Sequence, residues 1–157
     1  MTISETELTS RFLVMPEHMN PAGTAFGGII VSWMDMVAAM CAEKYSATRV
    51  ATVSIDCLSF LKPVHAGDHV VITAVAVYSG NTTVEIDVTV FTEDPVRNAS
   101  QLTTHALFTF VALSETGEKK QVPELSIVTD EDRMLCERAK LRRQYRKDCS
   151  CRDRTCT

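Results

Sequence analysis

One acidic residue, Asp35, stands inside an otherwise apolar segment, NPAGTAFGGIIVSWMDMVAAMCA, which spans residues 20–42. Burying an unpaired carboxylate in an apolar surrounding is costly, so its presence there needs an explanation. At helical spacing its neighbours include Ser32, Ala38 and Ala39, whose small side chains leave room for another molecule to approach. The neighbours alone leave two interpretations open: an aspartate on a solvent-facing stripe of the helix, or an aspartate that takes part in a reaction.

The turn before this segment, GTAFGG at residues 23–28, places small residues where a helix begins. Backbone N–H groups are unpaired at a helix start, and the helix dipole favours negative charge there. The turn can therefore hold an anion, or a carbonyl oxygen that becomes one during a reaction, although plain turn geometry is a competing explanation. Gly28 and Asp35 face the same way, but an axial rise of roughly 10 Å keeps both from touching one atom within a single chain. A second subunit would remove this difficulty.

These residues must be positioned by an α+β domain with one long helix and consecutive strands. The helix is expected from Gly27 or Gly28 to about Tyr45, because this stretch has good helix formers and no proline. A mixed segment at 7–15 fits a short strand, and turn-forming residues separate four longer strand-like runs. These runs span 50–61, 69–78, 83–91 and 103–113.

Short connections make consecutive strands antiparallel neighbours in most cases, and a sheet that curls around the long helix would bury it. The run 69–78 is apolar on both faces, which predicts that a partner subunit covers the second face. In the run 50–61, apolar and polar residues alternate. The apolar set is Ala51, Val53, Ile55 and Cys57, and the polar set is Thr52, Ser54 and Asp56.

The C-terminal part, residues 129–157, is expected to add a basic helix from about Thr129 to Lys147 and a flexible tail to a single domain over residues 1–128. Thr129 or Asp130 would cap the helix. The tail holds Cys149, Cys151 and Cys156, which lack zinc-like spacing with histidine or a second cysteine pair. We expect all six cysteines to be reduced thiols in a cytoplasmic protein.

Composition excludes several classes of protein. The chain has 157 residues and a formal net charge of −4, which argues against a general nucleic-acid binder. The N-terminus has no secretory signal, and the longest apolar stretch, 29–42, is too short for a membrane span. No histidine pair has metal-ligand spacing, and His105 is expected to face away from the long helix.

The segment 15–42 resembles the signature of hotdog-fold acyl-CoA thioesterases of the YciA type. The elements that carry the resemblance are Asn20, Gly23, Phe26-Gly27-Gly28 and Met34-Asp35, and it extends over roughly residues 8–115. It implies an antiparallel sheet wrapped around one central helix, with a C-terminal helix added here. It further implies a dimer, commonly assembled into a hexamer as a trimer of dimers, and no cofactor beyond the coenzyme A of the substrate itself.

The resemblance also implies a reaction, the hydrolysis of acyl-CoA to free acid and CoA. Asp35 would be the general base, or the nucleophile, for attack on the thioester carbonyl. Asn20 from the partner subunit would orient water or polarise the carbonyl, and the N–H groups of Gly27 and Gly28 would bind the oxyanion. Gly23 and Phe26 would belong to the substrate site.

The phosphates of coenzyme A require cations or free N–H groups near a groove. The basic helix, which also carries Lys140, Arg146 and Lys147, has a solvated surface as its competing explanation, and the turn at 79–83 has an ordinary hairpin as its own. The candidates are Lys62, the turn Ser79, Gly80, Asn81, Thr82 and Thr83, and the helix residues Arg138, Arg142 and Arg143.

Two other functions remain open. A hotdog hydratase or dehydratase would need a histidine near the helix start, and none lies between Asn20 and Ala42. A non-catalytic acyl-CoA-binding module would not need both Asn20 and Asp35. Adding acyl-CoA and a thiol-detecting dye distinguishes a hydrolase from a binder.

Overall fold

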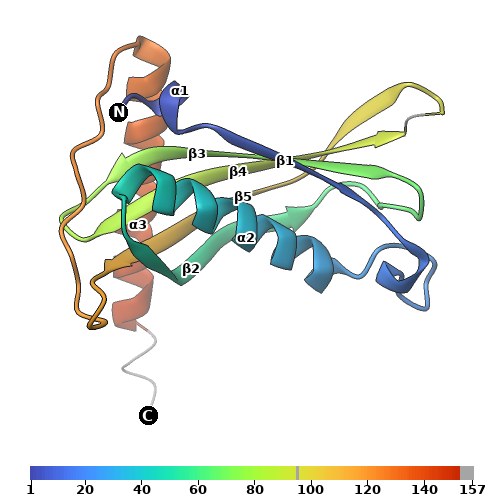
Figure 1. Ribbon diagram of the computed structural model, residues 1–157, viewed down its shortest axis with the longest axis horizontal. Coiled ribbons are helices and arrows are strands. Elements are labelled where there is room, and N and C mark those ends of the chain that lie inside the picture. The colour runs from blue at the N-terminus through green and yellow to red at the C-terminus, as the bar shows by residue number, and fades with distance from the viewer. Residues whose placement is uncertain (95, 153–157) are drawn as a thin grey trace.

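The computed structural model describes residues 1–94 and 96–152, with the side chains of all of these except 147 and 149–152. Its elements match the expected order of a short strand, a long helix, four strands and a C-terminal helix (Figure 1). In chain order they are α1 (Ile3–Thr6), β1 (Leu8–Leu13), the 3-10 helix η1 (Pro16–His18), α2 (Gly27–Ser46), β2 (Arg49–Phe60), β3 (His69–Ser79), β4 (Thr83–Asp94), β5 (Ala99–Leu113) and α3 (Asp130–Arg152).

The five strands form one antiparallel sheet in the order β1-β3-β4-β5-β2, so β1 and β2 are its edges. Helix α2 lies along one face of the sheet, and α3 crosses the other face at one end (Figure 1). The core lies between α2 and the inner sheet face, where Met34, Val37, Ile72, Ile86 and Phe108 are buried. This is the expected hotdog fold.

Helix α2 is buried on the side that faces the sheet and exposed along a narrow stripe on the other side. It ends where Ala47 adopts the left-handed conformation, with φ of 51°. The exposed stripe, defined by Gly28, Ser32, Met36 and Met40, follows the i, i+4 spacing of one helix face. Two methionines in this stripe are about half exposed, at 46% and 45%. The chain itself leaves this apolar surface uncovered.

Strand β2 differs from the regular alternation that the sequence predicted. Its pairing with β5 shifts between Thr52 and Ser54 and again between Asp56 and Ser59, which marks two bulges. Thr52 pairs with the core residue Phe110, whereas Ser54 pairs with Thr109 on the outer face. The polar residues of β2 therefore do not share one face, because each bulge inserts a residue that shifts the alternation.

The second face of β3 is covered in part by α3 of the same chain. Val77, Leu107 and Ala139 form a small buried cluster there, with Leu135 packed against it. A partner subunit was expected to cover this face; within one chain α3 covers part of it, because α3 carries an apolar stripe of its own. Thr129 caps α3 as expected, since its hydroxyl accepts from the Asp132 N–H at 3.0 Å.

The C-terminal cysteines lie partly within α3, which continues to Arg152, beyond the expected end at Lys147. Cys149 and Cys151 thus fall in helix, and Cys156 lies outside the described residues. Cys41 is buried under α1, and burial raises the pKa of its thiol to about 11. Within residues 1–94 and 96–152, no helix is long and apolar enough to cross a lipid bilayer.

Candidate active site

Asp35 lies beside the exposed stripe of α2, where the helix passes edge strand β2. Its side chain is half-buried, and its Oδ1 accepts a hydrogen bond of 2.7 Å from the Thr52 hydroxyl. This contact crosses from helix to strand. Thr52 pairs with the core residue Phe110 and therefore faces α2, and the bulge that follows turns Ser54 to the opposite face. Among the described residues nothing donates to Oδ2, so one carboxylate oxygen is held and the other is open.

The turn that precedes α2 has free donors. Phe26 is the N-cap and gives no side-chain hydrogen bond, so the N–H groups of Gly27 and Gly28 have no acceptor among the residues described. Aromatic rings lie close to both glycines: a Cβ on Gly28 would lie 2.3 Å from the Phe26 ring, and one on Gly27 would lie 3.2 Å from the Phe60 ring. Free N–H groups at the start of a helix are able to bind an anion.

Asn20 organises the loop that leads into this turn. Its Oδ1 accepts from the N–H groups of Ala22 and Thr24 at 2.9 and 3.2 Å, and its Nδ2 donates to the Thr24 hydroxyl at 3.0 Å. Gly23 sits at φ of 79°, a conformation that favours glycine, and donates to the Asn20 carbonyl. The carboxamide oxygen is thus occupied, while Nδ2 retains one N–H for another acceptor.

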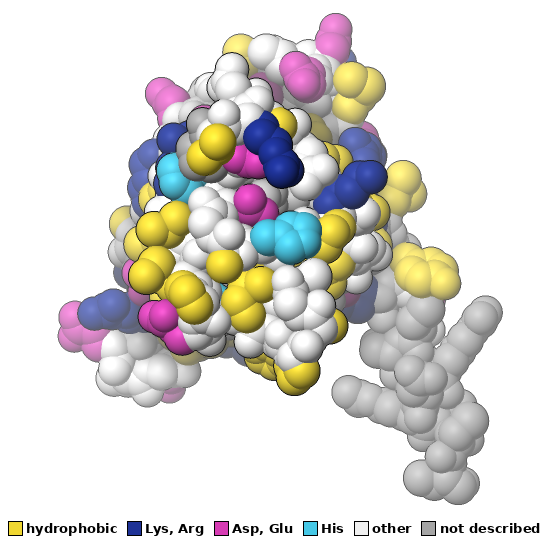
Figure 2. Space-filling view, turned by 90° about the vertical axis from the view of Figure 1, so that its right-hand side faces the viewer, with side chains coloured by type: hydrophobic (Ala, Val, Ile, Leu, Met, Phe, Trp, Pro, Cys, Tyr) yellow, Lys and Arg dark blue, Asp and Glu magenta, His cyan; other side chains and the backbone are white. Residues whose placement is uncertain are grey.

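The predicted site residues of the loop and turn lie at one end of the molecule. A pocket of about 190 Å³ opens there between the start of α2 and the end of β2, and Thr24, Gly27, Ile30, Phe60 and Lys62 line it. Figure 2 looks onto this end and shows hydrophobic side chains gathered around it. Asp35 does not line this pocket, so one chain does not join Asp35 to the loop and turn in a single cavity.

The predicted coenzyme A contacts fall into two groups far apart in one chain. Lys62 follows β2, and the end of β2 pairs with Thr104 of β5. The 79–83 turn ends beside Val111 of the same strand. Seven strand residues separate these points, or roughly 23 Å. A larger hollow of about 680 Å³, at the C-terminal end of α2, contains none of the predicted residues.

Arg143 is the basic-helix residue that reaches the 79–83 turn. Its Nη1 donates to the Thr83 hydroxyl at 3.0 Å, and its guanidinium lies 5.4 Å from the centre of the Tyr78 ring. The same guanidinium crowds Gly80, where a Cβ would lie 2.6 Å from Nη1. Arg138 is exposed and Arg142 is half-buried. The structure thus brings together one arginine and the turn out of the predicted set.

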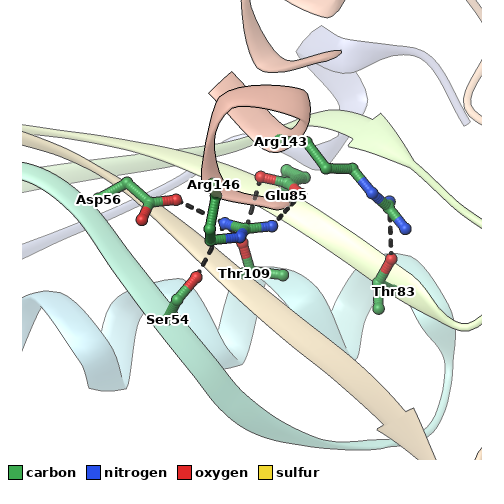
Figure 3. A network of polar contacts seen from close by, with 7 residues as sticks. All are labelled: Ser54, Asp56, Thr83, Glu85, Thr109, Arg143 and Arg146. Carbon is green, nitrogen blue, oxygen red and sulfur yellow. Dashed lines mark hydrogen bonds and ion pairs between the residues drawn. The ribbon is translucent and has the colours of Figure 1, made fainter. Parts of the chain in front are cut away.

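Arg146, by contrast, points into the structure rather than to solvent (Figure 3). Its guanidinium contacts Ser54 and Asp56 of β2, Thr109 of β5 and Glu85 of β4. Glu85 is fully buried, and burial raises the pKa of its carboxyl while the Arg146 charge opposes that rise. No sequence pattern indicates this role, since Arg146 resembles the exposed basic residues near it in the chain.

Thr52 is a second residue that the sequence analysis missed, because regular alternation placed it with Ser54 and Asp56. His105 faces away from α2 as expected, and it lies 2.7 Å from Asp87 on the outer sheet face. Among the residues described, no group of three or more His, Cys, Asp or Glu side chains is arranged to hold a metal ion.

Comparison with known proteins identifies the family to which this chain belongs. The sequence profile of the thioesterase superfamily matches residues 22–99. The chain is 34% identical over 125 residues to the acyl-CoA thioester hydrolase YciA of Escherichia coli, covering 77% of this chain and 94% of that protein. The chain belongs to the family of acyl-CoA thioester hydrolases within the thioesterase superfamily.

Solved structures agree in fold over nearly the whole length. An apo-hexameric acyl-CoA thioesterase has a TM-score of 0.91 at 31% identity, with 96% of each chain covered. The acyl-CoA hydrolase of Staphylococcus aureus, in complex with butyryl coenzyme A and coenzyme A, has a TM-score of 0.89 at 30% identity and covers 98% of this chain and 94% of its own. The same enzyme has been solved with an asparagine, an aspartate or a threonine changed to alanine.

Proposed function

We propose that the protein hydrolyses acyl-CoA thioesters to the free acid and CoA, with Asp35 as the general base. The observation that carries this proposal is the Asp35–Thr52 contact, because it holds one carboxylate oxygen and leaves the other open at an exposed apolar surface. Family membership supplies the substrate class, since the relatives are acyl-CoA thioester hydrolases.

In the proposed reaction, Asp35 takes a proton from a water molecule whose oxygen attacks the thioester carbonyl carbon. The tetrahedral oxyanion would be bound by the free N–H groups at the start of α2. The C–S bond then breaks, and the CoA thiolate takes the proton back from Asp35. In the alternative reaction, Asp35 itself attacks the carbonyl and the C–S bond breaks to release CoA thiolate. Water then hydrolyses the mixed anhydride, which restores the Asp35 carboxylate, releases the free acid and supplies the proton that the thiolate takes up.

The structure favours one of two roles for Asn20 in this reaction. Its Oδ1 is occupied by two backbone N–H groups, so it is poorly placed to accept from water. Its Nδ2 has a free N–H and can donate to the substrate carbonyl. Asn20 therefore polarises the thioester in our proposal, and Thr52 orients Asp35.

Residue spacing supports this set of three residues. In the S. aureus enzyme, the asparagine, aspartate and threonine that were changed to alanine are separated by 15 and 17 residues. Asn20, Asp35 and Thr52 have the same order and the same separations. Three matching positions in a chain of 30% identity are difficult to attribute to chance alignment.

The proposed site is completed by a second copy of this chain. One chain leaves the exposed stripe of α2 uncovered beside edge strand β2, on which Val53 is 59% exposed. A partner that covers this surface would place its own Asn20 loop near Asp35, which one chain does not do. Assembly into a hexamer is proposed from the hexameric relative.

For the coenzyme A phosphates, the proposed contact is Arg143 with the turn at 79–83, because this cation already lies against the turn. Arg138 and Arg142, which precede Arg143 on the same helix, would add positive charge. Lys62, at the opposite end of the sheet, can join the same ligand only if it comes from another subunit.

The experiment that tests the function is hydrolysis of acyl-CoAs from short to long chain, followed with a thiol-detecting dye. Wild type is expected to release CoA, and Asp35→Asn is expected to lose at least a hundredfold in kcat, as for loss of a general base. Retained oligomeric state and circular dichroism serve as the folding control. Equal turnover in both proteins would contradict the role of Asp35, and CoA binding without turnover would indicate a binding module.

A further inference from the structure

Within three positions of strand β2, side chains that would normally share a face lie on opposite faces of the sheet. Thr52 faces α2 and holds Asp35, whereas Ser54 and Asp56 face α3. On a regular strand, Thr52 and Ser54 would point the same way, because side chains alternate with a period of two. The extra residue of the first bulge, Val53, makes the difference.

The segment of β2 that lies between the two bulges pairs with β5 over three residues, Ser54 to Asp56. The ladder to β5 is interrupted on both sides of the pair Ser54 and Asp56, and the second interruption contains Cys57 at φ of 60°. A bulge increases the local twist of a strand, and a change of twist at the first bulge would rotate the neighbouring Thr52 side chain. A restraint from outside the ladder would help to hold the observed conformation.

Arg146 supplies such a restraint from the opposite face (Figure 3). It donates to the Ser54 hydroxyl at 2.8 Å and to the Asp56 carboxylate, the two outward side chains between the bulges. It is anchored in turn to central strands, through Thr109 at 2.7 Å and Glu85 at 3.1 Å. One guanidinium thus ties the bulged edge strand to β5 and β4.

The rest of α3 is attached elsewhere. Its apolar contact, through Leu135 and Ala139, is made with residues of β3 and β5, and Arg143 contacts the turn that begins β4. Substitution of Arg146 therefore removes the link to β2 while leaving other contacts that hold α3 on the sheet.

We infer that Arg146 is a positioning residue for the hydrolase site: by fixing Ser54 and Asp56, it sets the orientation of Thr52 and hence of Asp35. This inference rests on the proposed function, in which Asp35 is the base. The line of contacts runs from α3 through the sheet to α2, so a residue on the outer face affects chemistry on the inner face. Arg146 itself touches neither substrate nor reacting atoms.

The test compares Arg146→Met with Arg133→Met, a matched control on the same helix whose guanidinium, among the described residues, pairs only with exposed Asp130. Arg146→Met is expected to lower kcat about tenfold and to leave KM within about threefold, since a displaced catalytic group costs rate rather than binding. Arg133→Met is expected to match wild type. Arg146→Lys cannot reproduce the forked contacts and is expected to restore activity only in part.

A double-mutant cycle distinguishes positioning through Thr52 from general loss of structure. If Arg146 acts through Thr52, the double variant Thr52→Val with Arg146→Met is no slower than Thr52→Val alone, within about twofold. Losses that multiply, or equal kcat in Arg146→Met and Arg133→Met, would overturn the inference.

Two further measurements keep the inference testable. If Arg146→Met does not fold, Asp56→Ala replaces it, because Arg146 then loses its acceptor on residue 56 and keeps Glu85 and Thr109; unchanged kcat in Asp56→Ala would contradict the inference. If wild type hydrolyses no acyl-CoA, the proposed function fails, and hydrogen exchange of residues 52–56 decides the structural part. Faster exchange in Arg146→Met than in Arg133→Met supports it, and equal exchange overturns it.

Discussion

At the scale of single residues, the hydroxyl of Thr52 is the group whose removal tests the site most directly. Thr52→Val keeps the shape of the side chain and removes the donor to Asp35. A hydrogen bond to a charged group contributes roughly 1.5–3 kcal/mol, so kcat is expected to fall by about one to two orders of magnitude. Thr52→Ser, which keeps the hydroxyl, is the control and should retain most of the rate; steady-state kinetics with one acyl-CoA measures both.

Residue identity alone made Asp35 and the glycine turn predictable, because a lone carboxylate in an apolar helix and a Gly-Gly step are unusual locally. Thr52 was not predictable in this way. That Thr52 lies on the opposite face from Ser54 and Asp56 depends on a bulge, and a bulge is decided by how two strands pair rather than by any residue within one of them. Arg146 was hidden for a similar reason, since its carboxylate partners are far away in the sequence.

At the scale of elements, the docking of α3 depends on a buried carboxylate, which gives stability a pH dependence. Burial raises the pKa of Glu85 in the folded protein, against the opposing charges of Arg146 and Arg143 on α3. Arg146 also binds a second carboxylate, that of Asp56 on β2. The Thr109 hydroxyl on β5 donates a hydrogen bond to Glu85. A raised folded pKa contributes stability below the unfolded pKa, and this contribution is lost as pH rises through the folded pKa.

Glu85→Gln removes this titration and keeps the size of the side chain. The melting temperature of wild type minus that of Glu85→Gln is therefore expected to be most positive at acidic pH and to decrease as the pH rises. Thermal unfolding of both proteins in matched buffers between about pH 4 and 8 measures this difference, since each protein controls for all other groups. A difference in melting temperature that grows with pH would show that the arginine charges lower the pKa of Glu85 by more than burial raises it.

At the scale of the whole molecule, the fold was the most predictable feature. Helix and strand periods, short connections and one helix apolar on most sides lead to the same architecture from independent signals. What covers each outer surface was less predictable. The second face of β3 is covered by α3, whereas the exposed stripe of α2 is left open, and apolar composition alone does not distinguish these two cases.

A mixing experiment tests the shared site directly. Asn20→Ala and Asp35→Asn are each expected to be inactive alone, because every site in either homodimer lacks one of the two groups. If each site takes Asn20 from one subunit and Asp35 from the other, a mixed dimer has one site with both groups and one with neither. Unfolding and refolding an equal mixture makes about half of the dimers mixed and restores about a quarter of wild-type activity.

The controls follow from the same arithmetic. Refolding either variant alone should give no recovery, and refolding wild type alone measures the yield. Sedimentation must show that the mixture regains the assembly of wild type, because lost assembly would also abolish activity. No recovery from a well-assembled mixture would place Asn20 and Asp35 in one subunit's site, and the chain would then have to close the gap between the pocket at the start of α2 and the Asp35 side chain by itself.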